Sequence, residues 1–164
     1  MTGASTGIGR AVADELAGAG ALVWACVRTD QDEKSLQRQH GPAVRVLRMD
    51  VTDDGSVSAA AERVLAAGPL HGLVNNAGVA LAGPLEYLPL EVFRRQIEVN
   101  LTGQLSVTQA MLPALRQARA QGAPARIVMI GSIAGRIAGS MLGPYHASKF
   151  GLVEIGRASC RERV

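Results

Sequence analysis

The stretch TGASTGIGRAVADELAGAGALVWACV, residues 2–27, decides the fold, because it joins a glycine loop, a helical segment and a buried strand. Gly3, Gly7 and Gly9 allow the backbone to turn tightly and to approach a phosphate closely. Apolar residues at every fourth position from 8 to 16 follow the period of a helix, whose first amides would point at an anion. The stretch therefore predicts a phosphate cradle, although a plain turn at a helix entry could contain the same glycines.

Short apolar runs alternate with helical segments along the rest of the chain. The runs are rich in β-branched residues, are bounded by Gly, Pro or Asp, and lie at 21–27, 43–49, 70–76 and 126–132. The segments with helical patterns lie at 8–20, 30–39, 54–68 and 89–121. This alternation predicts an α/β fold of Rossmann type, a doubly wound parallel sheet with helices on both faces. In such a fold, ligands bind beyond the carboxyl ends of the strands.

The composition argues against several classes of protein. At 164 residues the chain is about one domain long, and it has no apolar run of the roughly 18–20 residues that a membrane span needs. We therefore expect a cytoplasmic protein without a membrane segment. The net charge of +3 comes from scattered arginines with few aromatic residues, so nucleic-acid binding is not expected. Cys26 and Cys160 form neither a disulfide framework nor a metal-ligand spacing, and no metal site is predicted.

Six sequence elements, in order along residues 2–149, resemble the short-chain dehydrogenase/reductase family. They are TGASTGIG at 2–9, Asp50 with Val51, NNAG at 75–78, Asn100, Ser132 and YHASK at 145–149. The stretch from residue 70 to residue 152 is most similar to the retinol and hydroxysteroid dehydrogenase subgroup. The resemblance implies a nicotinamide cofactor and hydride transfer between an alcohol and a ketone or aldehyde. It also implies a small apolar substrate and assembly as a homodimer or homotetramer.

The resemblance further implies a catalytic set of Asn100, Ser132, Tyr145 and Lys149. In that set Tyr145 exchanges the proton of the substrate hydroxyl, and Ser132 orients the substrate oxygen. Lys149 lowers the pKa of Tyr145 and binds the nicotinamide ribose, while Asn100 binds a water that completes a proton relay. The spacing supports one part independently, because residues four apart share a helix face and an ammonium within about 4 to 6 Å favours a phenolate. Two ordinary surface residues would show the same spacing.

The cofactor contacts that the resemblance implies come from several loops. They are Gly3, Ser5, Thr6, Gly7, Ile8, Gly9, Arg28, Asp50, Val51, Asn75, Asn76, Ala77, Gly78, Tyr145 and Lys149. Arg28 ends the second strand of the family pattern, where members that prefer NAD usually carry Asp. A guanidinium suits a 2′-phosphate, so the sequence predicts NADP(H) rather than NAD(H). The alternative is that Arg28 is a solvated strand end, and Thr6 stands where a second basic residue is often found.

Both ends of the chain depart from the family pattern. Only Met1 and Thr2 precede the glycine loop, so we expect most of the first strand, and the elements beyond residue 153, to be missing. Residues 154–164 can be back-translated into DNA that resembles a common sequencing adapter. We therefore expect residues 1–153 to be a partial dinucleotide-binding domain and 154–164 to be a non-native tail. The alanine content and the excess of arginine over lysine favour a GC-rich, bacterial genome.

Three functional hypotheses follow from the sequence. The first is an NADP(H)-dependent alcohol/ketone oxidoreductase, which the complete catalytic set favours. The second is a non-catalytic dinucleotide-binding protein of the same fold. The third is that the chain, as it stands, is an inactive fragment.

Overall fold

The computed structural model, which describes residues 1–161, contains two pairs of parallel strands. Strand β1 (Val23–Val27) pairs with β2 (Val44–Arg48), and β3 (Gly72–Asn75) pairs with β4 (Arg126–Met129). Each strand falls within one of the four predicted apolar runs and is shorter than that run. The predicted α/β class and parallel pairing are confirmed, and the sheet is incomplete, as expected.

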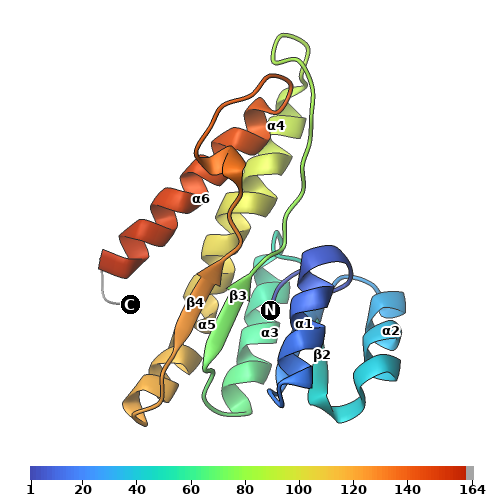
Figure 1. Ribbon diagram of the computed structural model, residues 1–164, viewed down its shortest axis with the longest axis vertical. Helices are drawn as coiled ribbons and strands as arrows, with labels where there is room; N and C mark the ends of the chain where they lie inside the picture. Colours follow the sequence, from blue (N-terminus) through green and yellow to red (C-terminus); the bar gives the residue numbers. More distant parts are fainter. Residues whose placement is uncertain (162–164) are drawn as a thin grey trace.

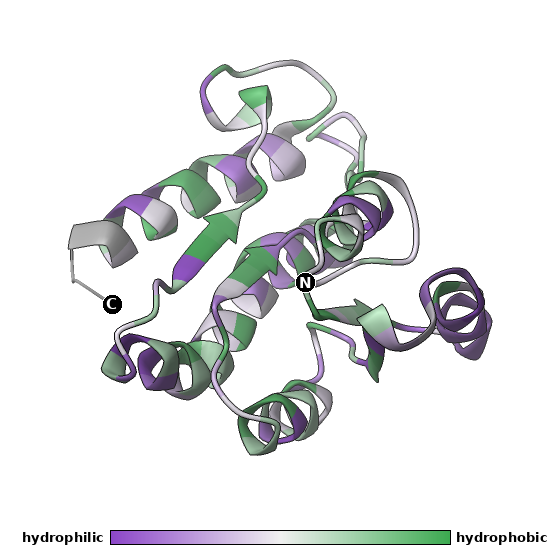
Figure 2. Cartoon of the chain, turned by 60° about the horizontal axis from the view of Figure 1, so that its bottom comes forward, coloured by the Kyte–Doolittle hydropathy of each residue, from purple (hydrophilic) through white to green (hydrophobic). Residues whose placement is uncertain are grey.

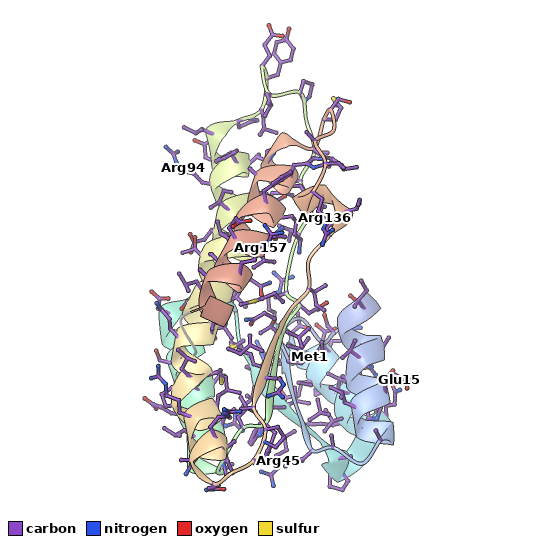
Figure 3. All side chains as sticks on the ribbon, turned by 60° about the vertical axis from the view of Figure 1, so that its left-hand side comes forward. Met1, Glu15, Arg45, Arg94, Arg136 and Arg157 are labelled. Atoms are coloured by element: carbon purple, nitrogen blue, oxygen red, sulfur yellow. The ribbon has the colours of Figure 1, made fainter. Side chains whose placement is uncertain are left out.

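The first residues of the chain lie between the two strand pairs and hydrogen-bond to both. The Met1 carbonyl accepts from the Cys26 N–H at 2.9 Å, and the Ala4 N–H donates to the Cys26 carbonyl at 3.0 Å. On the other side, the Thr2 N–H donates to the Val74 carbonyl at 3.0 Å. Figure 3 shows Met1 among the interior side chains. This segment joins the two pairs where the glycine loop begins, which places that loop between them.

Helices cover both faces of the strands. Helices α1 (Gly7–Gly18) and α2 (Asp30–His40) pack on the face of β1 that carries Val23, Ala25 and Val27. Helices α3 (Asp54–Ala66) and α5 (Gly103–Ala120) pack on the opposite face with Cys26 and Leu47. Alternate residues of a strand point to opposite faces, so one short strand can contribute to two apolar clusters. This arrangement is the predicted doubly wound fold.

Two helices of the first half, α2 and α3, begin at side-chain caps. The Thr29 hydroxyl accepts from the Asp32 N–H at 3.1 Å at the start of α2, and Asp53 accepts from the Ser56 N–H at 3.0 Å at the start of α3. Such caps satisfy backbone donors that have no partner within the helix. Helix α2 buries only Leu36, and Figure 2 shows that its other residues are mostly hydrophilic. It is therefore the outer layer of this half.

The second half is dominated by one long interrupted helix and the helix that packs on it (Figure 1). Helix α4 (Leu90–Ile97) continues through a π-helical turn (Glu98–Thr102) into α5, within the predicted helical stretch. A 3₁₀ turn (Ile133–Gly135) follows β4, and helix α6 (Gly143–Arg161) packs against α4, the π-helical turn and this 3₁₀ turn. Another short 3₁₀ turn (Gly41–Ala43) links α2 to β2.

Helix α6 extends from the YHASK motif into the segment that was expected to be non-native. That expectation for residues 154–164 stays a prediction, and residues 162–164 lie outside the described part of the chain. Within residues 1–161, none of the helices has both the length and the apolar character that crossing a membrane requires.

Candidate active site

A cavity of about 290 Å³ lies at the carboxyl ends of β1, β2 and β3. Most of the predicted cofactor contacts line it: Gly3, Ser5, Thr6, Ile8, Gly9, Arg28, Asp50, Val51, Asn76, Ala77 and Gly78. Cys26, Val27, Met49, Val79 and Val99 complete the lining. The remaining predicted contacts, Gly7, Asn75, Tyr145 and Lys149, lie outside it. The structure therefore gathers residues from the glycine loop, two strand ends and the NNAG segment around one space.

The glycine loop has the geometry of a phosphate cradle. Gly3 and Gly7 adopt φ angles of +63° and +57°, in the left-handed region that favours glycine. A Cβ on Gly9 would lie 2.1 Å from the Gly3 carbonyl oxygen, so this close approach is possible only without a side chain. The Asn76 side chain donates to the Gly3 carbonyl at 3.0 Å and fixes the turn. Helix α1 then begins without a side-chain cap, and its first amides are suited to an anion.

The end of the cavity near β1 and β2 carries opposite charges. The backbone N–H of Thr52 donates to the Asp50 carboxylate at 3.0 Å, and the Thr52 hydroxyl donates to it at 2.8 Å. The N–H bond is the largest influence that lowers the pKa of Asp50, and the nearby guanidinium groups of Arg28 and Arg95 act in the same direction against burial. Asp50 is therefore an anionic acceptor beside a cavity wall that also contains the cationic Arg28.

Ser132 lies directly after β4, at the start of the 3₁₀ turn. Its Oγ accepts from the Ala134 N–H at 3.1 Å, which leaves the hydroxyl hydrogen available for another acceptor. The Nδ1–H of His146, on the first turns of α6, donates to the Ala134 carbonyl at 3.0 Å. The end of β4 and the start of α6 are thus joined next to Ser132.

Tyr145 and Lys149 share one face of α6, as their spacing predicts. The Lys149 ammonium lies 5.9 Å from the centroid of the Tyr145 ring. It also donates to the Ile130 carbonyl, just beyond β4, at 2.7 Å. Lys149 is only 4% exposed, and burial lowers the pKa of its ammonium. The ammonium is therefore held between the tyrosine and the end of β4, a contact that the sequence analysis did not predict.

Asn100 lies in the π-helical turn, and its buried side chain is engaged by the protein. Its Oδ1 accepts from the Val79 N–H at 2.8 Å, and its Nδ2 donates to the Val79 carbonyl at 2.9 Å and to the Ser148 hydroxyl at 3.1 Å. The amide thus connects α6 to the segment that follows β3. The water-relay role of Asn100 stays a prediction.

Three buried polar residues of the site were missed by the sequence analysis. Gln96, Gln104 and Thr108 all contact the segment at the end of β3. A signal was present, since with Asn100 they occupy every fourth position of a helix that is otherwise apolar on that side. Thr108 accepts from the Asn75 side chain at 2.7 Å, so Asn75 supports the strand and points away from the cavity.

Comparisons with known proteins agree with this geometry. The family described as short chain dehydrogenase matches residues 1–163. An NADPH-dependent 3-dehydrocapnine reductase of Ornithobacterium rhinotracheale is 36% identical, over 99% of this chain and 58% of its own length. Retinol dehydrogenase 5 of Homo sapiens is 41% identical, over 93% of this chain and 47% of its own length. The chain thus spans about half the length of the curated relatives that it matches.

Solved structures are similar over nearly the whole chain. A short-chain dehydrogenase from Streptomyces avermitilis superposes with a TM-score of 0.90 at 31% identity, covering 98% of this chain and 59% of that protein. An actinorhodin polyketide ketoreductase with NADPH superposes with a TM-score of 0.86 at 33% identity, covering 96% of this chain and 61% of that protein.

Proposed function

Because the chain belongs to the short-chain dehydrogenase family, we propose that its protein is an NADP(H)-dependent oxidoreductase that interconverts an alcohol and a ketone or aldehyde. The observation that carries the proposal is the cavity at the strand ends, which the glycine loop, Arg28 and the NNAG segment line together. Its position is the one at which doubly wound folds bind dinucleotides.

The residues of the cavity fit the parts of the cofactor. The close-packed glycine loop and the start of α1 would hold the pyrophosphate, and Asp50 would accept a hydrogen bond from the adenine amino group. Arg28 would pair with the 2′-phosphate of NADP(H). Two similar proteins support a preference for NADP(H): the 3-dehydrocapnine reductase is named as NADPH-dependent, and the polyketide ketoreductase structure is named as one with NADPH. When bound, the nicotinamide would donate or accept the hydride.

Tyr145 is the group proposed to move the proton. In the direction of reduction, the phenol gives its proton to the substrate oxygen, and the phenolate that forms is stabilised by the nearby Lys149 ammonium. Lys149 suits this role because its bond to Ile130 holds it in place on the same helix face. Ser132, whose hydroxyl hydrogen is not used by its cap, would donate to the same substrate oxygen.

The surroundings of Ser132 favour an apolar substrate. Ile133, Ile137 and Met141 are each more than half exposed on the segment that follows it. The Met141 carbonyl accepts from the Gly83 N–H at 2.7 Å, so this segment is in contact with the loop that follows β3. Small apolar alcohols and carbonyl compounds are therefore the substrates to test. We also propose a homodimer or homotetramer, as the family resemblance implies.

The test is an assay of dinucleotide binding and turnover. The longest product of the gene and the 164-residue chain would each be titrated with NADPH and NADH, and then assayed with a panel of apolar ketones, aldehydes and alcohols. We expect NADPH to bind more tightly and to be oxidised in the presence of a carbonyl substrate. Binding without turnover across the panel would instead favour a non-catalytic dinucleotide-binding protein. The absence of dinucleotide binding by the longest product would refute the proposal.

A further inference from the structure

A polar stripe runs along the long helix of the second half. It consists of Gln96, Asn100, Gln104 and Thr108, which are exposed by only 0%, 0%, 1% and 5%. Polar side chains are rarely buried without hydrogen-bond partners, because an unpaired buried donor or acceptor is costly. The hydrogen-bond partners of these four side chains therefore show which part of the backbone the stripe fixes in place.

The stripe faces every second residue at the end of β3 and beyond it. Thr108 binds the side chain of Asn75, and Gln104 donates to the Ala77 carbonyl. Further along the chain, Asn100 binds both the N–H and the carbonyl of Val79. A spacing of two residues is that of an extended strand. At Ala77 and Val79, helix side chains thus bind backbone groups that a neighbouring strand would otherwise bind.

Gln96 lies at the N-terminal end of the stripe, and both the oxygen and the nitrogen of its side-chain amide form hydrogen bonds. Its Nε2 donates to the Val79 carbonyl at 2.7 Å, and its Oε1 accepts from the Leu81 N–H at 2.8 Å. It is therefore the residue that links Val79, which lines the cavity, to the loop that leaves it. No other hydrogen bond to the Leu81 N–H is present within residues 1–161.

The π-helical turn explains how the four side chains stay in line. In a regular α-helix, residues four apart are rotated by about 40°, so three such steps would carry the stripe about 120° around the helix. A π-helical turn includes one additional residue, which corresponds to about 100° of rotation. The turn at Glu98–Thr102 lies in the middle of the stripe and nearly cancels this drift. The helix therefore keeps all four side chains directed at one extended segment.

We infer that Gln96 is a positioning residue for the cofactor: it holds the Val79–Leu81 backbone and thereby sets the shape of the cavity wall at Val79. This inference rests on the proposed function. It assigns Gln96 no contact with substrate or cofactor, and its effect is transmitted through the backbone that it binds.

The test replaces Gln96 with a side chain whose hydrogen bonding depends on pH. In the Gln96→Glu protein, a protonated carboxyl can donate to Val79 and accept from Leu81, as the glutamine does. The ionised carboxylate can only accept, and it would place one oxygen against the Val79 carbonyl oxygen. Gln96→Met has a similar size and can make neither bond at any pH. Gln117→Glu, at an exposed position of α5, is the matched control.

The dissociation constant for NADP⁺ would be measured between about pH 5.5 and pH 8, a range in which a buried carboxyl with a raised pKa is expected to titrate. We expect Gln96→Glu to bind like the parent at the acidic end and about tenfold more weakly at the basic end, since a buried donor–acceptor pair is lost. Gln96→Met should bind weakly at all pH values. Gln117→Glu should follow the parent throughout.

Three further results separate the possible failures. If the parent binds NADP⁺ and Gln96→Glu follows the control at every pH, the inference about Gln96 is wrong while the proposed function stands. If the near-ultraviolet circular dichroism of Gln96→Glu is lost over the same pH range as binding, the residue supports folding rather than the cavity wall, and the inference also fails. If the parent binds no dinucleotide, the proposed function fails and the role of Gln96 in cofactor binding fails with it.

Discussion

The two halves of the molecule form the walls of the cavity in different ways. The nucleotide half, which contains α1, β1, α2 and β2, presents backbone turns and exposed charges such as Arg28. The reaction half, which contains β3, α4, α5, β4 and α6, holds its backbone with buried amide and hydroxyl side chains, of which Asn100 is the central member. Figure 1 shows the two halves side by side, with the N-terminus between them.

This difference predicts opposite sensitivities. A wall made of closely approaching backbone has no room for an added atom, so the nucleotide half should be most sensitive to a gain of volume. A wall held by buried side chains depends on each hydrogen-bond partner, so the reaction half should be most sensitive to a loss of polar atoms. Substitutions chosen on each side can therefore test whether the halves act separately.

The largest effect is expected for Tyr145→Phe in the reaction half. The substitution removes only the phenolic oxygen, and the proposed proton transfer should slow by about 10²–10⁴-fold. NADPH affinity should be unchanged, because Tyr145 does not line the cavity at the strand ends. Steady-state turnover and NADPH titration would measure the two effects. Tyr87→Phe, at a position 74% exposed, is the control and should retain full turnover. Substantial turnover in Tyr145→Phe would contradict the assignment.

Gly9→Ala should produce the converse result in the nucleotide half. The new Cβ would lie 2.1 Å from the Gly3 carbonyl oxygen, so the loop must shift at a cost of about 1–3 kcal/mol. We expect at least a tenfold loss of NADPH affinity. Gly18→Ala is the matched control on the same helix, because a Cβ there meets no atom within 4 Å. NADPH titration and urea unfolding of both variants would check this, and equal affinities would show that the loop is not a tight cradle.

Arg28→Ala should separate the two dinucleotides within the nucleotide half. Removing the guanidinium should weaken NADPH binding roughly tenfold, as expected for loss of a charge-assisted hydrogen bond, and should leave NADH binding unchanged. Arg45→Ala is the control. It removes a cation of β2 that lies 5.2 Å from the centre of the Trp24 ring on β1. The ratio of the two dissociation constants is the measurement. If the parent protein bound NADPH and NADH with equal dissociation constants, Arg28 would not select the 2′-phosphate of NADPH.

The same contrast explains how much the sequence could predict. The elements of the nucleotide half follow from local signals: glycines that permit positive φ, a capping Thr29, and short β-branched runs. Those signals act over a few residues, so a single sequence shows them. The positions of β1 and β2 were predicted correctly for that reason. Most of the residues that the family resemblance implies as cofactor contacts line the cavity, and their role in binding stays a prediction.

The reaction half depends on partners distant in sequence, which a single sequence does not identify. The side chains of Gln96 and Gln104 interpreted alone could be solvated residues of a helix, since their partners lie 15 to 27 residues away. The π-helical turn has no local sequence signal comparable to a glycine or a cap. Lys149 was placed correctly on the face of Tyr145, but its bond to Ile130 needed the packing of α6 on β4. In this half the sequence predicted the positions of residues along the helices better than it predicted what their side chains contact.

The smallest effect is expected from the charge of Asp50, and it should be confined to the nucleotide half. The Thr52 N–H bond lowers the pKa of Asp50 in the folded protein below its ordinary value of 3.8. The carboxylate therefore contributes stability that is present above the unfolded pKa and is lost as the pH falls through the folded pKa. The asparagine of the Asp50→Asn variant cannot titrate. The free energies of unfolding of parent and variant should therefore differ most near neutral pH and converge in acid. Urea unfolding at a series of pH values would measure the difference.

The control for that comparison is Glu62→Gln, which removes a carboxylate exposed on α3. It should leave the pH dependence of stability close to that of the parent, since an exposed carboxylate has few interactions to lose. Turnover at saturating NADPH should be the same in Asp50→Asn and in the parent, because the hydrogen bonds of Asp50 join it to Thr52 and Ser56, and only the weaker charge attraction of Arg95 links it to the reaction half. If turnover at saturating NADPH changed, the charge of Asp50 would influence the proposed proton transfer at Tyr145. The two halves would then form one coupled site.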